Sequence, residues 1–139
     1  MVILVIIGIV PSFIVKNVVV NSYETRAVSI REVNLKNQCD ILGNQLMKEN
    51  YLIEPDSDVI NGELSMLSAI YNGRILIINK DAKIIKDTYD IDVGKYALSE
   101  EVIQCFEGKS TANYDDKNAY IEMTSPITKM DSNTIEGVM

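Results

Sequence analysis

The sequence predicts an α+β domain that follows a long N-terminal helix. Three observations support this prediction: an uncharged apolar N-terminus, a proline-free stretch with helical spacing, and short β-rich segments between turn residues in the second half. Helices that precede runs of antiparallel strands are typical of that class. The 139 residues are enough for one domain with a single core.

The N-terminal run MVILVIIGIVPSFIV has no charged side chain, and the apolar stretch continues to about Val20. That length approaches the ~20 residues that cross the hydrocarbon core of a membrane. The run lacks the basic start and the small-residue cleavage site of a signal peptide. We therefore expect a transmembrane segment over residues 1–20, with a buried core helix as the alternative. The missing basic flank and the apolar C-terminal strand also suggest a chain cut from a longer protein.

Residues 21–50 contain no proline and are expected to extend this helix. Two apolar stripes follow helical spacing, Leu35, Cys39, Leu42 and Leu46 near its end and Tyr23, Ala27 and Ile30 nearer the N-terminus. The first stripe is expected to pack on the domain's own core. The second has two interpretations, because it could pack on that core or pair with the helix of a second copy.

Turn and cap residues divide the rest of the chain. Pro55 ends the long helix, and Gly73 is expected to close a second helix that ends at Tyr71. Ser99 is expected to cap a short helix that Gly108 closes. The expected strands cover residues 74–79 and 83–88, a segment on each side of the turn 115–118, and a last segment from Asn133. This order gives about five strands in one central antiparallel sheet.

Composition argues against several classes of function. The net charge is −7, with 20 acidic and 13 basic residues, so a basic surface for nucleic acid is not expected. The chain contains no histidine, which removes His-dependent catalysis, His-ligated metals and a phosphoaccepting histidine. Cys39 and Cys105 are interpreted as free, buried thiols. The sequence predicts no catalytic residue, no metal site and no cofactor.

The order of these motifs resembles the extracytoplasmic sensor domains of bacterial membrane histidine kinases, of the PAS-like or Cache type. The supporting residues are YNGRILIINKDAKIIKDT (71–88), Gly94-Lys95, SEEV (99–102), Gly108, SPI (125–127) and Gly137-Val138. The resemblance covers most of residues 35–139 and implies a PAS-like sheet with helices on one side. It implies a sensor domain at residues 21–139 outside the cell membrane, dimeric through its long helix. A separate cytoplasmic kinase would complete such a two-component system.

A ligand site is expected between the sheet and the loop from Tyr89 to Leu98, for a small molecule or a peptide. Six polar residues are candidates to line it: Arg74, Asp87, Tyr114, Tyr120, Glu122 and Thr124. Glu122 could pair with a cationic group, and Arg74 could bind a carboxylate through two donors. The alternative is that the alternating polar residues of the strand face water.

Two other classes of protein are alternatives to the sensor. A type IV pilin-like structural subunit also has an apolar N-terminal helix before an antiparallel sheet, but MVILVIIGIV lacks the acidic residue expected near such a start. A membrane-tethered hydrolase would need paired carboxylates held by buried neighbours. The acidic residues here cluster instead in expected turns, such as Asp115-Asp116.

Overall fold

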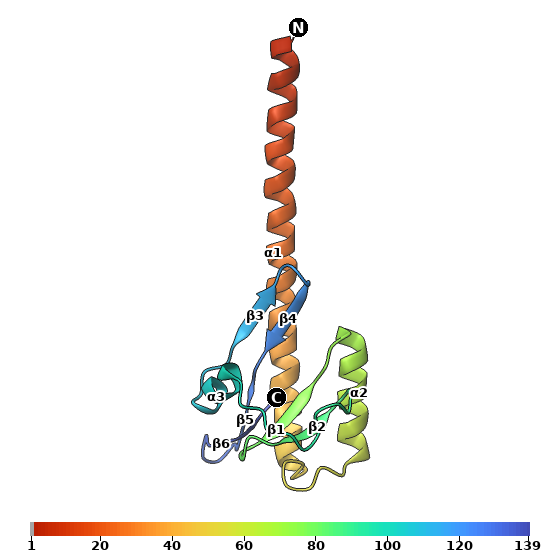
Figure 1. Cartoon of the computed structure of the whole chain (residues 1–139), viewed down its shortest axis with the longest axis vertical. Helices are drawn as coiled ribbons and strands as arrows, with labels where there is room; N and C mark the ends of the chain where they lie inside the picture. Colours follow the sequence, from red (N-terminus) through yellow and green to blue (C-terminus); the bar gives the residue numbers. More distant parts are fainter. Residues whose placement is uncertain (1) are drawn as a thin grey trace. The chain divides into compact units, whose positions relative to one another are not determined.

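The computed structural model describes the backbone of residues 2–139 and the side chains of residues 14–139. The chain forms two compact units, Met1–Leu35 and Lys36–Met139. The first unit is the N-terminal part of one long helix. The second unit contains the end of that helix, two further helices and the strands (Figure 1).

The long helix α1 spans Val2–Lys48 and belongs to both units (Figure 1). Its side chains from residue 14 to residue 20 are exposed. The membrane segment predicted over residues 1–20 lies largely outside the described side chains. Where side chains are described, the structure has no helix with a stretch long and apolar enough to cross a membrane.

The end of α1 packs into the core of the second unit, as its apolar stripe predicts. Leu42 and Leu46 are 2% and 0% exposed, while Leu35 and Cys39 are half-buried. The two buried leucines cluster with residues from the following turn, helix α2 (Asp58–Tyr71) and two strands, namely Tyr51, Ile60, Leu64, Ile77 and Ile127. Helix α1 is thus part of the domain core.

Helix α2 ends at Tyr71, as predicted, but its cap differs from the prediction. It starts at Asp58, where the Ser57 hydroxyl accepts the Ile60 N–H at 3.4 Å. Its left-handed terminal residue is Asn72, with φ 49°, and not Gly73. Asparagine tolerates this conformation, and the Gly73 N–H still closes the helix by donating to Ser68 O at 3.0 Å.

The strands form two antiparallel sheets. The main sheet has the order β2-β1-β6-β5, from strands Ile84–Asp87, Leu76–Asn79, Ile135–Val138 and Pro126–Thr128. A separate two-stranded sheet pairs β3 (Ala112–Asp115) with β4 (Tyr120–Met123). The predicted α+β class with antiparallel strands and a long helix is confirmed. The prediction of one five-stranded sheet is wrong.

The predicted and observed sheets differ after the turn 115–118, where the sequence predicts one strand and the structure has two, β4 and β5. The chain after β4 leaves its partner at Thr124 and Ser125 and enters the main sheet at Pro126. Pro126 has no N–H to donate, so it suits β5, which lies at the edge of the sheet. Strand β6 needs Gly137, because a Cβ there would lie 2.6 Å from the carbonyl oxygen of Ile78 on β1.

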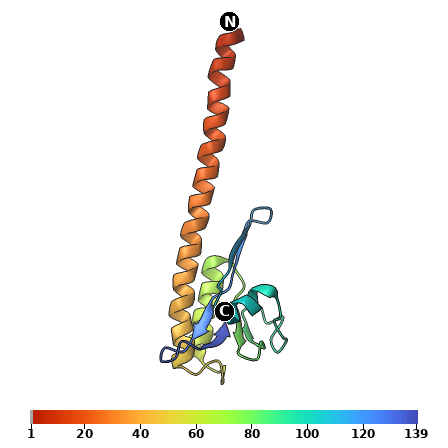
Figure 2. The ribbon, with the colours of Figure 1, turned by 90° about the vertical axis from the view of Figure 1, so that its left-hand side faces the viewer.

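The main sheet has a hydrophobic cluster on each face. Ile77 of β1 packs with α1 and α2, and the next residue, Ile78, packs with the short helix α3 (Glu100–Phe106). Successive side chains of a strand point to opposite faces, which places the two isoleucines in different clusters. Figure 2 shows α3 on the side of the strands away from the end of α1. Helix α3 is capped by Ser99 as predicted.

Candidate functional site

Asp87 is a fully buried acidic residue at the end of β2. Its carboxylate accepts three backbone N–H groups of the following loop, from Tyr89, Ile91 and Asp92, each at 2.9 Å. The first of these bonds is an Asx turn, in which a short side chain reaches the N–H two residues on. The start of the loop therefore folds around one carboxylate.

Arg74 supplies the positive charge that this buried carboxylate requires. Its Nε donates to Oδ1 of Asp87 at 2.9 Å and its Nη2 donates to Oδ2 at 2.5 Å, a two-pronged pair. The Arg74 side chain is 31% exposed, whereas that of Asp87 is 0% exposed. The hydrogen bonds from Arg74 and then from the loop amides hold the pKa of Asp87 well below its usual range, against the effect of burial.

Asp92 and Lys95 extend this arrangement toward solvent. Asp92 accepts from Arg74 Nη2 at 2.5 Å and from Lys95 Nζ at 2.6 Å, and its side chain is 28% exposed. The hydrogen bonds from Lys95 and Arg74 lower the pKa of Asp92. We call Arg74, Asp87, Asp92 and Lys95 the ion-pair cluster.

The loop is also bonded to β2 through its backbone. The Gly94 N–H donates to Ile84 O, the Ile84 N–H donates to Lys95 O, and the Ala97 N–H donates to Ala82 O, each at 2.8 Å. This strip of loop lies along β2 on the edge that β1 does not use. A sheet edge that is covered in this way is less open to pairing with another strand.

The chemistry of the ion-pair cluster is that of a structural clamp. Its two carboxylates have lowered pKa values and its cations are already paired. General acid–base catalysis needs a group that titrates near neutral pH, and the lowered pKa values of Asp87 and Asp92 move both carboxylates away from it. Over the described part of the chain, no group of three His, Cys, Asp or Glu side chains could hold a metal ion.

The structure divides the six predicted site residues between two sheets. Arg74 and Asp87 adjoin the main sheet and are paired with each other. Tyr114, Tyr120 and Glu122 lie on the two-stranded sheet, where Tyr114 is half-buried and the other two are exposed. The pairing of Arg74 with Asp87 means that Arg74 is already occupied by a carboxylate of its own chain.

Thr124 does not belong to the exposed polar row that the alternation predicted. It follows the last residue of β4 and is 8% exposed. Its hydroxyl accepts the Thr111 N–H at 3.0 Å and lies 2.9 Å from the Thr111 hydroxyl. The strand pattern ends one residue earlier than the sequence indicated, so this threonine closes the base of the β3–β4 hairpin.

The predicted pocket location, between the sheet and α3, contains a hydrophobic cluster. Ile78, Ile84 and Val138 of the sheet pack there against Val102 and Cys105 of α3. Cys105 is a free thiol and is 0% exposed, and burial raises its pKa. Cys39, also a free thiol, is half-buried, and burial raises its pKa to about 11. The prediction of free thiols is confirmed.

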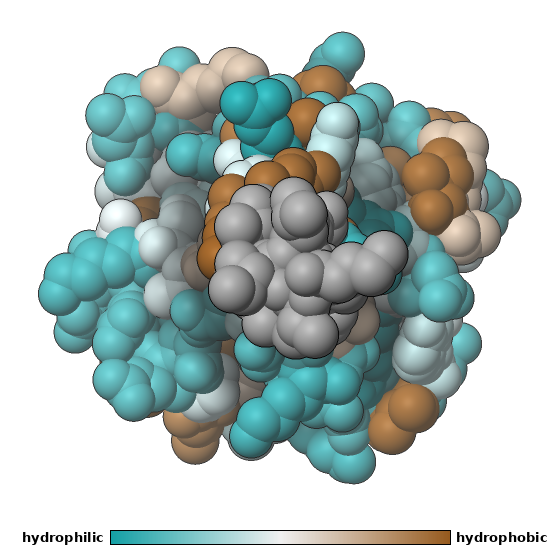
Figure 3. All heavy atoms as spheres, turned by 90° about the horizontal axis from the view of Figure 1, so that it is seen from above, coloured by the Kyte–Doolittle hydropathy of each residue, from teal (hydrophilic) through white to brown (hydrophobic). Residues whose placement is uncertain are grey.

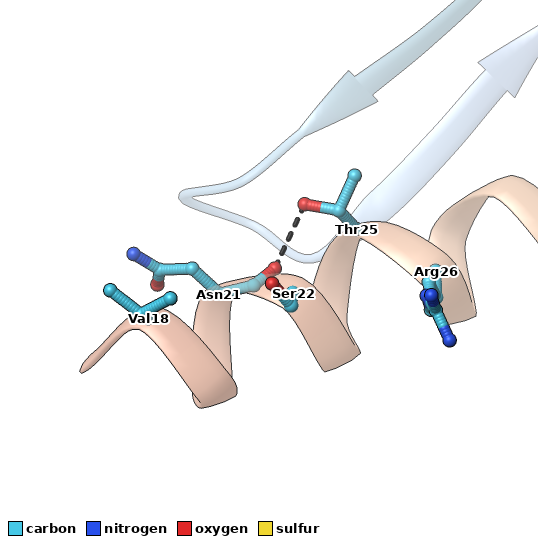
Figure 4. A pocket seen from close by; sticks show the side chains of 5 residues that line it. All are labelled: Val18, Asn21, Ser22, Thr25 and Arg26. Carbon is cyan, nitrogen blue, oxygen red and sulfur yellow. Dashed lines mark hydrogen bonds between the residues drawn. The ribbon is translucent and has the colours of Figure 1, made fainter. Parts of the chain in front are cut away.

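An open hollow lies along α1 in the first unit (Figure 4). It is lined by Val18, Asn21, Ser22, Thr25 and Arg26, and the Thr25 hydroxyl donates to Asn21 O. A hollow formed by neighbouring side chains of one exposed helix does not enclose a ligand. Viewed from the N-terminal end, the described surface is mainly hydrophilic, with apolar side chains in small groups (Figure 3).

Sequence reasoning missed Asp92 and Lys95 as members of the cluster. Both lie in the loop that is expected from the sequence to border a ligand site. The i, i+3 spacing of Asp92 and Lys95 is the one signal that could have paired them. The bond between Arg74 and Asp92 depends on the folded path of the loop and has no signal in the sequence.

Comparison with protein-family models gives no match for this chain, and comparison with curated proteins gives none.

Proposed function

We propose that the chain is the extracytoplasmic signal-sensing domain of a bacterial membrane sensor histidine kinase, with a PAS-like or Cache-type fold. The observation that supports this most directly is the continuity of α1. One helix begins in the apolar N-terminal stretch and contributes Leu42 and Leu46 to the core of the folded unit. A helix of this kind can couple a membrane anchor to a domain core.

The main sheet supports the PAS-like assignment. Its central strand β1 forms a hairpin with β2, and α3 follows after a loop that is bonded along β2. The cluster on one face includes the end of α1, and the cluster on the other includes α3. The packing of α1 and α2 on one face supports the assignment, while the four-stranded sheet, α3 on the opposite face and the separate β3–β4 hairpin differ from the implied fold.

The two clusters meet across β1 and offer a route for a signal. Ile78 packs on the side of α3, and its neighbour Ile77 packs with Leu46 of α1. A ligand that binds near the β2–α3 loop acts only if it prefers one of two arrangements of these elements. We infer that a change at this loop alters the packing of β1 on α1.

The first unit supports pairing with a second copy. Tyr23 and Ile30 are 72% and 63% exposed on α1, and two apolar residues seven apart lie on one face of a helix. Disulfide crosslinking of single cysteines placed from residue 23 to residue 30, in membranes, tests this pairing. If two helices pair in parallel, the yield of disulfide-linked dimer should rise and fall with helical periodicity from residue 23 to residue 30. An equal yield at every position would exclude a fixed helix pair.

Membrane topology provides the main test of the sensor proposal. Lys117 lies exposed in the turn of the β3–β4 hairpin, so Lys117→Cys should be accessible without disturbing the core. We expect the full chain in the membrane fraction, with this cysteine labelled by an impermeant maleimide in intact cells. Recovery as a soluble protein, or labelling only after lysis, would exclude an extracytoplasmic sensor. Assembly of the chain into fibres would favour the pilin-like alternative.

A further inference from the structure

Exposed apolar side chains are concentrated between β2 and α3. Six large hydrophobic residues are between 49% and 68% exposed, five in this segment and one in α3: Tyr89, Ile91, Val93, Tyr96, Leu98 and, in α3, Ile103. We call them the apolar loop residues. Single exposed hydrophobic residues are common on protein surfaces, whereas several on one short segment are typical of an interaction site.

The backbone that displays these side chains is fixed. The carboxylate of Asp87 binds three N–H groups of the loop, and Arg74 binds both Asp87 and Asp92. Gly94 and Ala97 are bonded to the β2 side of the hairpin. A loop that is ordered before binding loses little conformational entropy when a partner arrives. The ion-pair cluster therefore prepares the loop for contact.

The charge around the apolar loop residues selects the partner. From Tyr89 to Glu107 the chain has five acidic residues, of which Asp92 is paired with Lys95 and Arg74 and Glu107 with Lys109. Among the described residues, Asp90, Glu100 and Glu101 have no ion pair. Lys83, which pairs with Tyr96 through the backbone, adds one positive charge and does not reverse this balance. A partner with basic groups near its apolar side chains is attracted here, and an acidic one is repelled.

We propose that the apolar loop residues form the docking surface for a basic amphipathic peptide segment. Apolar side chains of the peptide contact the loop, and its Lys or Arg side chains pair with acidic residues at the rim. Asp90 follows Tyr89, and Glu100 and Glu101 follow Leu98 after one serine, so acids flank the loop at both ends. This inference rests on the ligand-binding role that the proposed function gives to the β2–α3 loop, and its test concerns binding alone.

Site-specific photo-crosslinking of the full chain tests the docking surface. A benzophenone side chain is placed at Ile91, and in a control chain at Met130, which is 74% exposed outside the loop. The probe is a fluorescent amphipathic helix of about 14 residues made of Leu and Lys, with Leu–Glu and Ser–Lys peptides as matched controls. The chain is kept in solution with a non-ionic amphipathic polymer. We expect the Leu–Lys adduct at Ile91 to exceed every control several-fold.

Variants of the loop and of its acidic ends separate the apolar contribution to binding from the charged contribution. Val93→Ser with Tyr96→Ser should reduce the Ile91 adduct at least tenfold, because each buried apolar side chain contributes about tenfold in affinity. The double variant Asp90→Asn with Glu101→Gln should bind the Leu–Lys peptide more weakly. Its binding should also depend less on salt concentration. Ile53→Ser, at a site 86% exposed outside the loop, should change nothing. Circular dichroism melts confirm that each variant folds.

Three results would overturn the proposal. Equal adducts at Ile91 and Met130 would show that the peptide has no preferred surface. Equal adducts with the Leu–Glu peptide would show that the acidic rim does not select the partner. Adducts between two copies of the chain in place of peptide adducts would assign the loop to self-association. Each result is independent of whether the chain has a sensory role.

Discussion

Asp87 and Asp115 form the same local turn in two different surroundings. Each ends a strand, and each carboxylate accepts the backbone N–H two residues on, from Tyr89 and Lys117 respectively, at 2.9 Å. Asp87 is fully buried and paired with Arg74. Asp115 is partly exposed, and its further partners are the backbone and side-chain amides of Asn118.

The difference lies in the range of the interactions that each turn requires. The turn at Asp115 uses residues within three positions, so it forms wherever the hairpin forms. The turn at Asp87 requires Arg74, thirteen residues earlier across the β1–β2 hairpin, because a buried carboxylate needs a partner charge. The same side chain is therefore a local turn residue in one sheet and a tertiary clamp in the other.

Removing the partner of the buried carboxylate should have the largest effect. Arg74→Met leaves Asp87 charged and buried, and we expect the free energy of unfolding to fall by about 3 kcal/mol. The matched variant Lys95→Met removes a cation that touches only the exposed Asp92, and it should change the stability little. Urea denaturation of the full chain measures both. Equal free energies of unfolding for Arg74→Met and Lys95→Met would mean that the loop amides alone compensate the charge of Asp87.

Acid should weaken the second unit through Asp87. Its pKa is lowered in the folded state, first by Arg74, so its contribution is complete above the unfolded value near 4 and is lost as the pH falls below that value. We expect the thermal midpoint to drop between about pH 4 and pH 2. Asp87→Asn should flatten this dependence, and Asp115→Asn should flatten it less. An unchanged profile in Asp87→Asn would contradict the clamp.

The elements that the sequence predicts well are those with local determinants. The β1–β2 hairpin depends on the turn NKDAK, and α3 depends on Ser99, whose hydroxyl accepts the Val102 N–H. Arg74 and Asp87 were both recognised as polar candidates but were assigned to a ligand. Their pairing depends on the register of β1 with β2, which places Leu76 opposite Asp87 after an irregularity between Ile77 and Ile78, and no local pattern predicts that irregularity.

The division into two sheets was not predictable for a related reason. Residues 119–124 alternate in the manner of one strand, and Thr124 continues the polar side of that alternation. In the structure Thr124 bonds to Thr111, and Ser125 exchanges backbone bonds with Met139. The competition between these distant partners divides the strand, and periodicity within the segment carries no information about it.

The base of the β3–β4 hairpin should contribute more to stability than its tip. Thr124→Val keeps the shape of the buried side chain and removes the acceptor of the Thr111 N–H. We expect a loss of about 1–2 kcal/mol, which is the cost of leaving a buried N–H without a partner. Thr128→Val, on the edge strand β5, is the matched control. Equal thermal stabilities of the two variants would mean that water replaces the lost acceptor.

Asp115→Ala should have the smallest effect and a local one. The variant removes the acceptor of the Lys117 and Asn118 amides at the tip of the hairpin, so their hydrogen exchange should accelerate. The thermal midpoint should stay that of the parent chain, because the tip is open to water, which can bond to the freed amides. Exchange at Tyr89, Ile91 and Asp92 serves as the internal reference, since these amides bond to Asp87. Faster exchange at those three amides in Asp115→Ala would show that the two turns are coupled, and the distinction between a local turn and a tertiary clamp would fail.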